Sequence, residues 1–325
     1  MLEVNNLKVD FNTPRGRLQA VRGVSLSLAK GDFLGIVGES GSGKSVTASS
    51  IMKLLPANAV MSGSIILSGE NPLEMTPAEL RAFRGRRIAM IFQEPGRSFD
   101  PIYNMSKTFL ETFRTLSPGI TEEESDARAV KLLEEVNLSK PAERLGNFPH
   151  QFSGGQLQRI MIALALASNP ELLIADEPTT ALDVTIQSEI VDLLMNLRKT
   201  RGMAIIFITH DIELVSNIAD RIIVMYSGLV MEESSAADIM KNPMHPYTAG
   251  LLGSLPTFGD HYSRRKLVSI PGGIPDPVYP EPGCPFEPRC PFARPECRNR
   301  IPGLDRKDGR YRCVIDGAKE PGRNG

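Results

Sequence analysis

A glycine-rich segment with one lysine is the clearest candidate for chemistry in this chain of 325 residues. It fits the pattern G-x-x-x-x-G-K-[ST] and lies between a predicted buried strand, 33–37, and a predicted helix, 45–55. Lys44 would neutralise the β- and γ-phosphates of a nucleotide, and the Ser45 hydroxyl would ligate Mg²⁺. The alternative is a turn that contains a lysine by chance, but the flanking strand and helix favour nucleotide binding. The candidate nucleotide-binding residues are Gly38, Ser40, Gly41, Gly43, Lys44 and Ser45.

Two carboxylates follow an apolar strand and could complete such a site. The stretch 172–175 is apolar and is followed at once by Asp176 and Glu177. Asp176 can hold Mg²⁺ through water, and Glu177 is placed to polarise an attacking water molecule. A solvated acidic loop at a strand end is the alternative, and the phosphate loop upstream makes it the weaker one.

Four cysteines form a second candidate site of a different kind, and they are Cys284, Cys290, Cys297 and Cys313. Their spacing, C-x₅-C-x₆-C-x₁₅-C, fits neither the C-x₂₋₄-C pairs usual for zinc nor the C-x₂-C-x₂-C run of ferredoxins. Four thiolates suit either a [4Fe–4S] cluster or zinc, so spacing alone does not choose the metal. Free structural cysteines are a third interpretation, and disulfides are rare in a reducing cytoplasm.

Composition changes where these cysteines occur. The 62 residues from Arg264 onward hold 11 of the 25 prolines. They carry a net charge of +5, whereas residues 1–263 carry −6. We therefore predict a body, 1–255, followed by a C-terminal extension, 256–325, that contains the four-cysteine site. An extension rich in proline and poor in aromatic residues has little to bury, and such units commonly need a metal.

The body alternates apolar strand patterns with helical ones, which predicts an α/β fold with a parallel core. A mostly helical insert, about 94–165, interrupts this alternation. The strand candidates are 24–28, 33–37, 65–67, 88–92, 172–175, 204–209 and 221–225. The helix candidates are 45–55, 111–115, 122–136 and 156–167.

Charge and hydropathy exclude several classes of protein. A net charge of −1 without a basic stripe argues against a general nucleic-acid binder. No apolar run approaches the ~18 residues of a membrane span. The N-terminal segment lacks the basic and apolar regions of a signal peptide, so we expect a cytoplasmic protein.

A Ser-Gly-Gly turn that opens a predicted helix reveals a family resemblance. Phe152-Ser153-Gly154-Gly155-Gln156 ends 20 residues before Asp176. Over about 1–255 the sequence resembles the ATPase subunit of an ABC transporter, with Phe152 where leucine is usual. The resemblance implies an ABC-type P-loop NTPase fold with N-terminal antiparallel strands and a helical subdomain. Its motifs appear in family order: the loop 38–45, Gln93, the signature 152–156, the strand 172–177, Ala181-Leu182-Asp183 and His210.

The resemblance also implies a role for each matching residue. Two such subunits pair head to tail around two ATP molecules, so Ser153, Gly155 and Gln156 would contact the partner's nucleotide. Asp183 would organise that interface, and His210 would contact the γ-phosphate. Gln93 would join Mg²⁺ and the attacking water to the membrane contact, with a plain strand cap as the alternative. Phe11 would stack on adenine, although a core phenylalanine explains that ring about as well.

Three later stretches narrow the branch of the family. The segments 242–248, 270–275 and 282–291 resemble the C-terminal region of oligopeptide/dipeptide importer ATPases. This implies a peripheral protein on the cytoplasmic face of the inner membrane. Its implied partners are two membrane permeases, a second ATPase subunit that is usually a paralogue, and an extracytoplasmic solute-binding protein. Some importer ATPases with this cysteine pattern carry an iron–sulfur cluster, which favours [4Fe–4S] over zinc.

Three alternatives to peptide import follow from the same residues. Import of nickel or another peptide-like solute uses the same kind of subunit. A soluble ABC ATPase acting on ribosomes or DNA usually has two cassettes or a coiled-coil insert, and this chain has neither. A non-hydrolysing scaffold often loses a motif residue, whereas Glu177, His210 and the signature are all present.

Overall fold

The computed structural model describes residues 1–180, 182–255, 269–306 and 309–315, and its chain forms two compact units. The first unit contains Met1–Leu28, Phe33–Leu73 and Ile208–Gly325. The second contains Ala29–Asp32 and Glu74–Phe207, and the predicted helical insert lies within it. Within the described ranges, no helix combines the length and the apolar character needed to cross a membrane.

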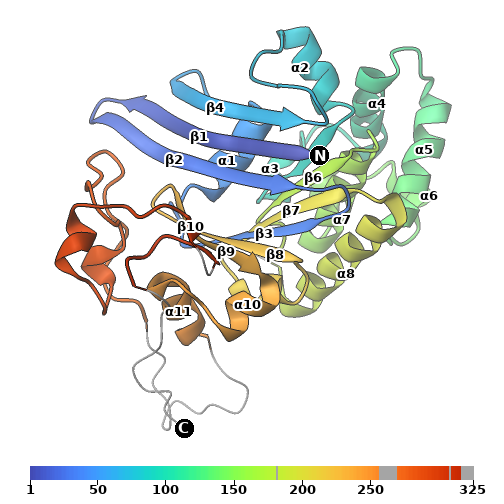
Figure 1. Ribbon diagram of the computed structural model, residues 1–325. Coiled ribbons are helices and arrows are strands. Elements are labelled where there is room, and N and C mark those ends of the chain that lie inside the picture. Colours follow the sequence, from blue (N-terminus) through green and yellow to red (C-terminus); the bar gives the residue numbers. More distant parts are fainter. Residues whose placement is uncertain (181, 256–268, 307–308, 316–325) are drawn as a thin grey trace. The chain divides into compact units, whose positions relative to one another are not determined.

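An antiparallel sheet begins the first unit (Figure 1). It consists of β1 (Leu2–Thr13), β2 (Gly16–Leu28) and β4 (Ala59–Leu67), in the order β2-β1-β4. This confirms the expected N-terminal antiparallel strands. The sequence patterns 24–28 and 65–67 mark only the ends of β2 and β4, and β1 was not predicted as a separate strand. Its register shifts between Val4 and Leu7 interrupt the alternation by which a half-buried strand is recognised.

A second group of strands in the first unit carries the phosphate loop. Its order is β10-β11-β9-β8-β3, with β3 parallel to β8 and the other neighbours antiparallel. The strands are β3 (Phe33–Val37), β8 (Arg221–Tyr226), β9 (Leu229–Ser235), β10 (Asp305–Arg306) and β11 (Gly309–Tyr311). The helices of this unit are α1 (Lys44–Ile51), α9 (Ile212–Ser216), α10 (Ala236–Lys241) and α11 (Pro246–Gly253).

The second unit holds three neighbouring strands, in the order β7-β6-β5. They are β5 (Ile88–Ile91), β6 (Leu172–Asp176) and β7 (Ala204–Thr209), whose last two residues belong to the first unit, and β5 is parallel to β6. The α-helices here are α2 (Pro77–Arg84), α3 (Pro95–Ser98), α4 (Met105–Leu116), α5 (Glu122–Glu135), α6 (Pro141–Arg144), α7 (Gly154–Leu166) and α8 (Val184–Arg201). A 3₁₀ turn, η1 (Pro149–Gln151), precedes α7. The strands match the sequence prediction closely, but α2, α3, α6 and α8 were not predicted as helices, and the predicted range 111–115 covers only the end of α4.

The described part of the C-terminal extension packs within the first unit. β11 pairs with β9, and the segment contains two 3₁₀ turns, η2 (Glu287–Arg289), directly followed by Cys290, and η3 (Pro295–Arg298), which contains Cys297. Phe286 is fully buried between Tyr226 of β8 and Tyr247 of α11, with ring centroids 5.5 and 5.3 Å away. Buried aromatic rings at these separations attract each other beyond their hydrophobic burial. The extension is therefore attached to the body by an aromatic core.

Removal of this core should loosen the extension. We expect Phe286→Ala to cost about 3–5 kcal/mol, because a buried ring is replaced by a cavity. Thermal unfolding and limited proteolysis would show a lower Tm and earlier cleavage after residue 255. The matched control is Tyr279→Ala, whose ring is exposed in the same extension. Equal effects of both changes would contradict a role for the aromatic core.

Candidate functional site

The phosphate loop joins the end of β3 to the start of α1. All five residues of β3 are buried, so the strand holds the N-terminal end of the loop in place. Lys44 is buried, and its ammonium donates hydrogen bonds to the carbonyl oxygens of Gly38 and Glu39, at 2.8 and 3.0 Å. The loop is thus curled around its own lysine. This conformation holds the cation at the centre of the loop where a phosphate would bind.

Neighbouring backbone presses closely on this loop. A Cβ on Gly38 would overlap with the carbonyl oxygen of Met225, and one on Gly43 would lie 2.6 Å from that of Ala20. Gly43 also has a φ of +98°, in the left-handed region. The Gly228 N–H, in the turn between β8 and β9, donates to the Ser42 carbonyl at 3.0 Å. The loop's shape therefore depends on β2, β8 and this turn.

Two other predicted residues lie in the first unit. Phe11 is half-buried on β1, opposite Leu18 of β2 and Ala59 of β4. Its ring belongs to the hairpin whose second strand carries Ala20, the neighbour of Gly43. His210 is exposed and directly follows β7. Adenine stacking by Phe11 and γ-phosphate contact by His210 stay predictions.

The second unit brings Gln93 and Glu177 together. Asp176 is buried at the end of β6, and Glu177 follows it with a φ of +47°. A left-handed conformation is strained for glutamate, and such strain concentrates at functional positions. The Glu177 carboxylate accepts hydrogen bonds from the Gln93 amide at 3.0 Å and from the Thr180 hydroxyl at 2.8 Å. Thr180 is a partner that the sequence did not indicate.

The signature residues form a helix cap in the second unit. The Ser153 hydroxyl accepts a bond from the Gln156 N–H, and the Gln156 side chain accepts one from the Ser153 N–H. A Cβ on Gly155 would meet Ile186 of α8 at 2.7 Å. Asp183 caps α8 by accepting a bond from the Ile186 N–H at 2.9 Å. Ala181, the first residue of its motif, lies outside the described residues.

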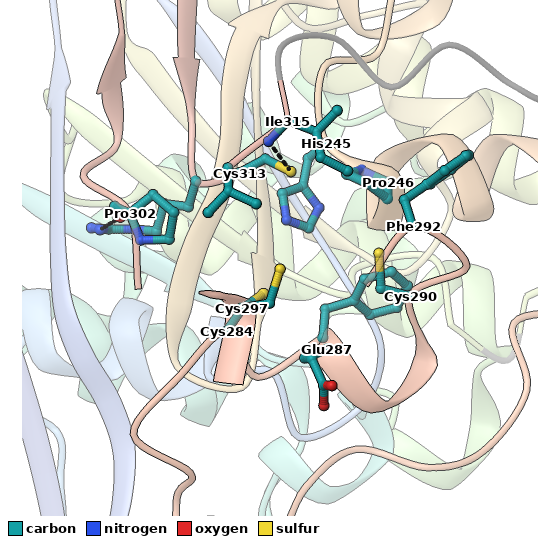
Figure 2. Close-up of a pocket in the computed structure, with 13 residues that line it drawn as sticks. His245, Pro246, Cys284, Glu287, Cys290, Phe292, Cys297, Pro302, Cys313 and Ile315 are labelled. Carbon is teal, nitrogen blue, oxygen red and sulfur yellow. Dashed lines mark hydrogen bonds between the residues drawn. The ribbon is translucent and has the colours of Figure 1, made fainter. Parts of the chain in front are cut away.

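All four cysteines line one small cavity in the first unit (Figure 2). Burial raises the pKa of Cys284 to about 12 and that of Cys290 to about 11, so these thiols stay protonated at neutral pH. The buried imidazole of His245 also lines the cavity, and burial lowers its pKa to about 3. It is therefore neutral, and its Nδ1 accepts a bond from the Tyr247 N–H at 3.0 Å.

The cavity does not have the geometry of a metal site. Over the described ranges, no group of three or more His, Cys, Asp or Glu side chains is placed to hold a metal ion. The expectation that the cysteines gather in one place is met, but a [4Fe–4S] cluster or zinc at them has no support here. Loss of the thiol protons would accompany any metal binding, because thiolates are the ligands.

Known proteins share both regions of this sequence. Residues 21–180 match the ABC transporter family, and residues 231–297 match the oligopeptide/dipeptide transporter C-terminal region. The oligopeptide transport ATP-binding protein OppD of Salmonella typhimurium is 42% identical, over 98% of this chain and 95% of its own length. OppD of Bacillus subtilis is 46% identical, over 90% of this chain and 82% of its own length. The chain belongs to the ABC transporter family. It is an ATP-binding subunit of the oligopeptide/dipeptide branch, as the motifs predicted.

Solved structures confirm the fold. The ATP-binding cassette MJ0796, solved as a dimer bound to ADP and phosphate, superimposes with a TM-score of 0.65 at 29% identity. The match covers 73% of this chain and 99% of that cassette. This ABC ATPase fold agrees with the predicted α/β class and its antiparallel N-terminal strands.

The contrast between two loop glycines tests the packing around the phosphate loop. Gly41 and Gly43 both have positive φ, at +81° and +98°, but a Cβ on Gly41 would meet nothing within 4 Å. Gly41→Ala should cost only about 1 kcal/mol of backbone strain. Gly43→Ala should add a clash with Ala20 and weaken ATP binding at least tenfold more. Calorimetric titration with ATP would measure both, and equal affinities would contradict the close approach.

Proposed function

We propose that this protein hydrolyses ATP to power the import of peptides across the cytoplasmic membrane. One observation carries the proposal: a single chain joins the ABC ATPase region to the C-terminal region of oligopeptide/dipeptide transporters. The proposed domains are the ATPase, 1–255, with its helical subdomain at about 94–165, and the extension, 256–325.

Nucleotide binding would use groups on the phosphate loop. The Lys44 ammonium, already centred in the loop, would bind the β- and γ-phosphates. The oxygen donors of Ser45, Gln93 and Asp176 suit Mg²⁺, which prefers oxygen ligands. When bound, Mg²⁺ would neutralise charge on the phosphates. Phe11 would add stacking on the adenine.

Glu177 would act as the general base in hydrolysis. Its carboxylate is oriented by Gln93 and Thr180, and a positioned carboxylate can accept a proton from an attacking water molecule. The hydrogen bond from Gln93 to Glu177 supports the proposed role of Gln93, which is to link the surface that contacts the permease to the catalytic carboxylate. His210, exposed after β7, would contact the γ-phosphate.

A second ATPase subunit, which we expect to be a paralogue, would complete the site. Ser153, Gly155 and Gln156 would then contact the partner's nucleotide through the N-terminal end of α7. The side chain of Val184, next to Asp183, is 82% exposed. Burial of this side chain against the second subunit would remove apolar surface from water.

Permease docking would use the segment around Gln93. The large apolar side chains of Phe92 and Ile102 are 46% and 73% exposed. Two permeases would cover them and hold the protein on the cytoplasmic face of the inner membrane, in a system with an extracytoplasmic solute-binding protein. Nickel or another peptide-like solute remains the alternative cargo, because solute specificity resides in the permeases and the binding protein.

We propose that the four cysteines serve as one metal site in the extension, which would require their side chains to reorient from the arrangement in the structure. The cavity that they share is the observation in favour, and a [4Fe–4S] cluster is the preferred occupant, with Zn²⁺ as the alternative. We assign it a structural or docking role. Cys284, Cys290, Cys297 and Cys313 would be the ligands after loss of their protons.

Replacement of the general base separates hydrolysis from binding. Glu177→Gln keeps both hydrogen-bonding capacity and size but cannot take a proton. We expect steady-state ATP hydrolysis to fall by a factor of ~10²–10⁴. ATP binding should be retained, whereas Lys44→Ala should impair it. Phosphate-release assays paired with calorimetry would test this, and hydrolysis at the parent rate would refute the role of Glu177.

Metal analysis after anaerobic purification tests the cysteine site. A cluster predicts iron and sulfide bound in stoichiometric amounts and a brown colour, both lost in Cys290→Ser. Colourless protein with one equivalent of zinc would refute the cluster and assign zinc to the site. Protein that binds no metal would leave the cavity as a cluster of free thiols.

A further inference from the structure

The phosphate loop contains an acidic side chain, which is a liability for a loop that binds anions. Glu39 is the second residue of the loop, directly after Gly38. Its carbonyl oxygen lies 3.0 Å from the Lys44 ammonium that would hold the phosphates. An uncompensated carboxylate on a residue of this loop would repel a bound triphosphate, since like charges raise the energy of the bound state. The charge of Glu39 therefore needs a partner.

That partner comes from the C-terminal extension, 250 residues away in the sequence. Nη1 of Arg289 donates to both carboxylate oxygens of Glu39, at 3.1 and 2.9 Å. The side chain of Arg289 is 6% exposed and that of Glu39 is 29% exposed. Burial on this scale reduces the screening by water that makes surface ion pairs weak. The pair lies wholly within the first unit.

The guanidinium is held in place by four further groups. It donates to the carbonyl oxygens of Pro271 and Ile270, at 2.8 and 3.2 Å, and to the Tyr226 hydroxyl at 3.1 Å. It also lies over the ring of Phe286, 6.0 Å from its centroid. Since these contacts fix the guanidinium of Arg289, little side-chain entropy is lost when it pairs with Glu39.

The backbone of Glu39 is tied to the same region. Its N–H donates to the Tyr247 hydroxyl at 3.0 Å, and Tyr247 belongs to the aromatic core that holds the extension. The extension also touches the hairpin of β1 and β2, where the Gln19 N–H donates to the Pro277 carbonyl at 2.9 Å. The extension thus binds the phosphate loop at Glu39 and also contacts β2 at Gln19.

We propose that Arg289 is a positioning residue for ATP binding, which neutralises and fixes Glu39 so that the phosphate loop can accept the triphosphate. The extension is then a working part of the nucleotide site. This inference rests on the proposed function, because it assumes that ATP binds at the loop. The argument needs no metal at the cysteines.

A charge-rescue experiment tests it with the full chain. Arg289→Gln should weaken ATP binding about five- to tenfold in 50 mM salt, and less in 0.5 M salt, because salt screens the repulsion. Glu39→Gln alone should bind ATP slightly tighter. The double variant should regain the affinity that Arg289→Gln loses, since the repelling carboxylate is gone. Arg289→Lys keeps the charge but loses the bonds that Nε and Nη2 make to Pro271 and Ile270, so it should bind ATP more tightly than Arg289→Gln and less tightly than the parent protein.

Calorimetry with ATP and Mg²⁺ measures these affinities, and steady-state kinetics should show the loss in KM with kcat nearly unchanged. Arg298→Gln is the matched control, because it removes an exposed ion pair with Glu287 in the same extension. A double variant as weak as Arg289→Gln, or an affinity in Arg289→Gln equal to the parent's, would overturn the proposal. A parent protein that did not bind ATP would instead refute the proposed function.

Discussion

The carbonyl oxygens of Ala20 and Met225 approach the phosphate loop so closely that only glycine fits at positions 43 and 38. Much of the first unit serves this constraint. β3 ends where the loop begins, β2 and β8 supply the two carbonyls, and the Gly228 turn binds Ser42. Because neighbouring backbone defines the loop, the protein's own packing holds its anion-binding shape. Such preorganisation reduces the entropy that nucleotide binding must overcome.

The same neighbourhood explains why the extension stays attached. Phe286 completes an aromatic core with Tyr226 and Tyr247, and β11 adds to the edge of β9. The buried Glu233 carboxylate strengthens this joint, since it pairs with both Arg221 of β8 and Arg310 of β11. Removal of the extension would expose the rings of Tyr226 and Tyr247 and would take one of its two arginine partners from Glu233, and both losses are costly.

Local patterns predicted the buried parallel strands and the loop well, but they did not predict β9, β10 or β11. The range 33–37 was predicted as a strand and is β3, and the apolar run before Asp176 is β6, since buried parallel strands read as short apolar runs bounded by turns. By contrast, β1 escaped because bulges break its alternation. The pairing of Glu39 with Arg289 could not be inferred from spacing, because only the fold brings residues 250 positions apart together. The cysteine site was predicted only in part. Clustering in the sequence indicated that the four cysteines share one place, and the structure puts them around one cavity, but without a metal-binding geometry.

Charge placement connects the two candidate sites. Arg289 is adjacent in sequence to Cys290, and its fork holds Glu39 in the phosphate loop. Since η2 ends at Arg289, one side chain connects the segment beside the cavity to the phosphate loop. Tyr226 offers a parallel connection, since its hydroxyl accepts from Arg289 while its ring packs on Phe286. Under the proposed role of Arg289, the extension would help set the charge that an incoming triphosphate encounters.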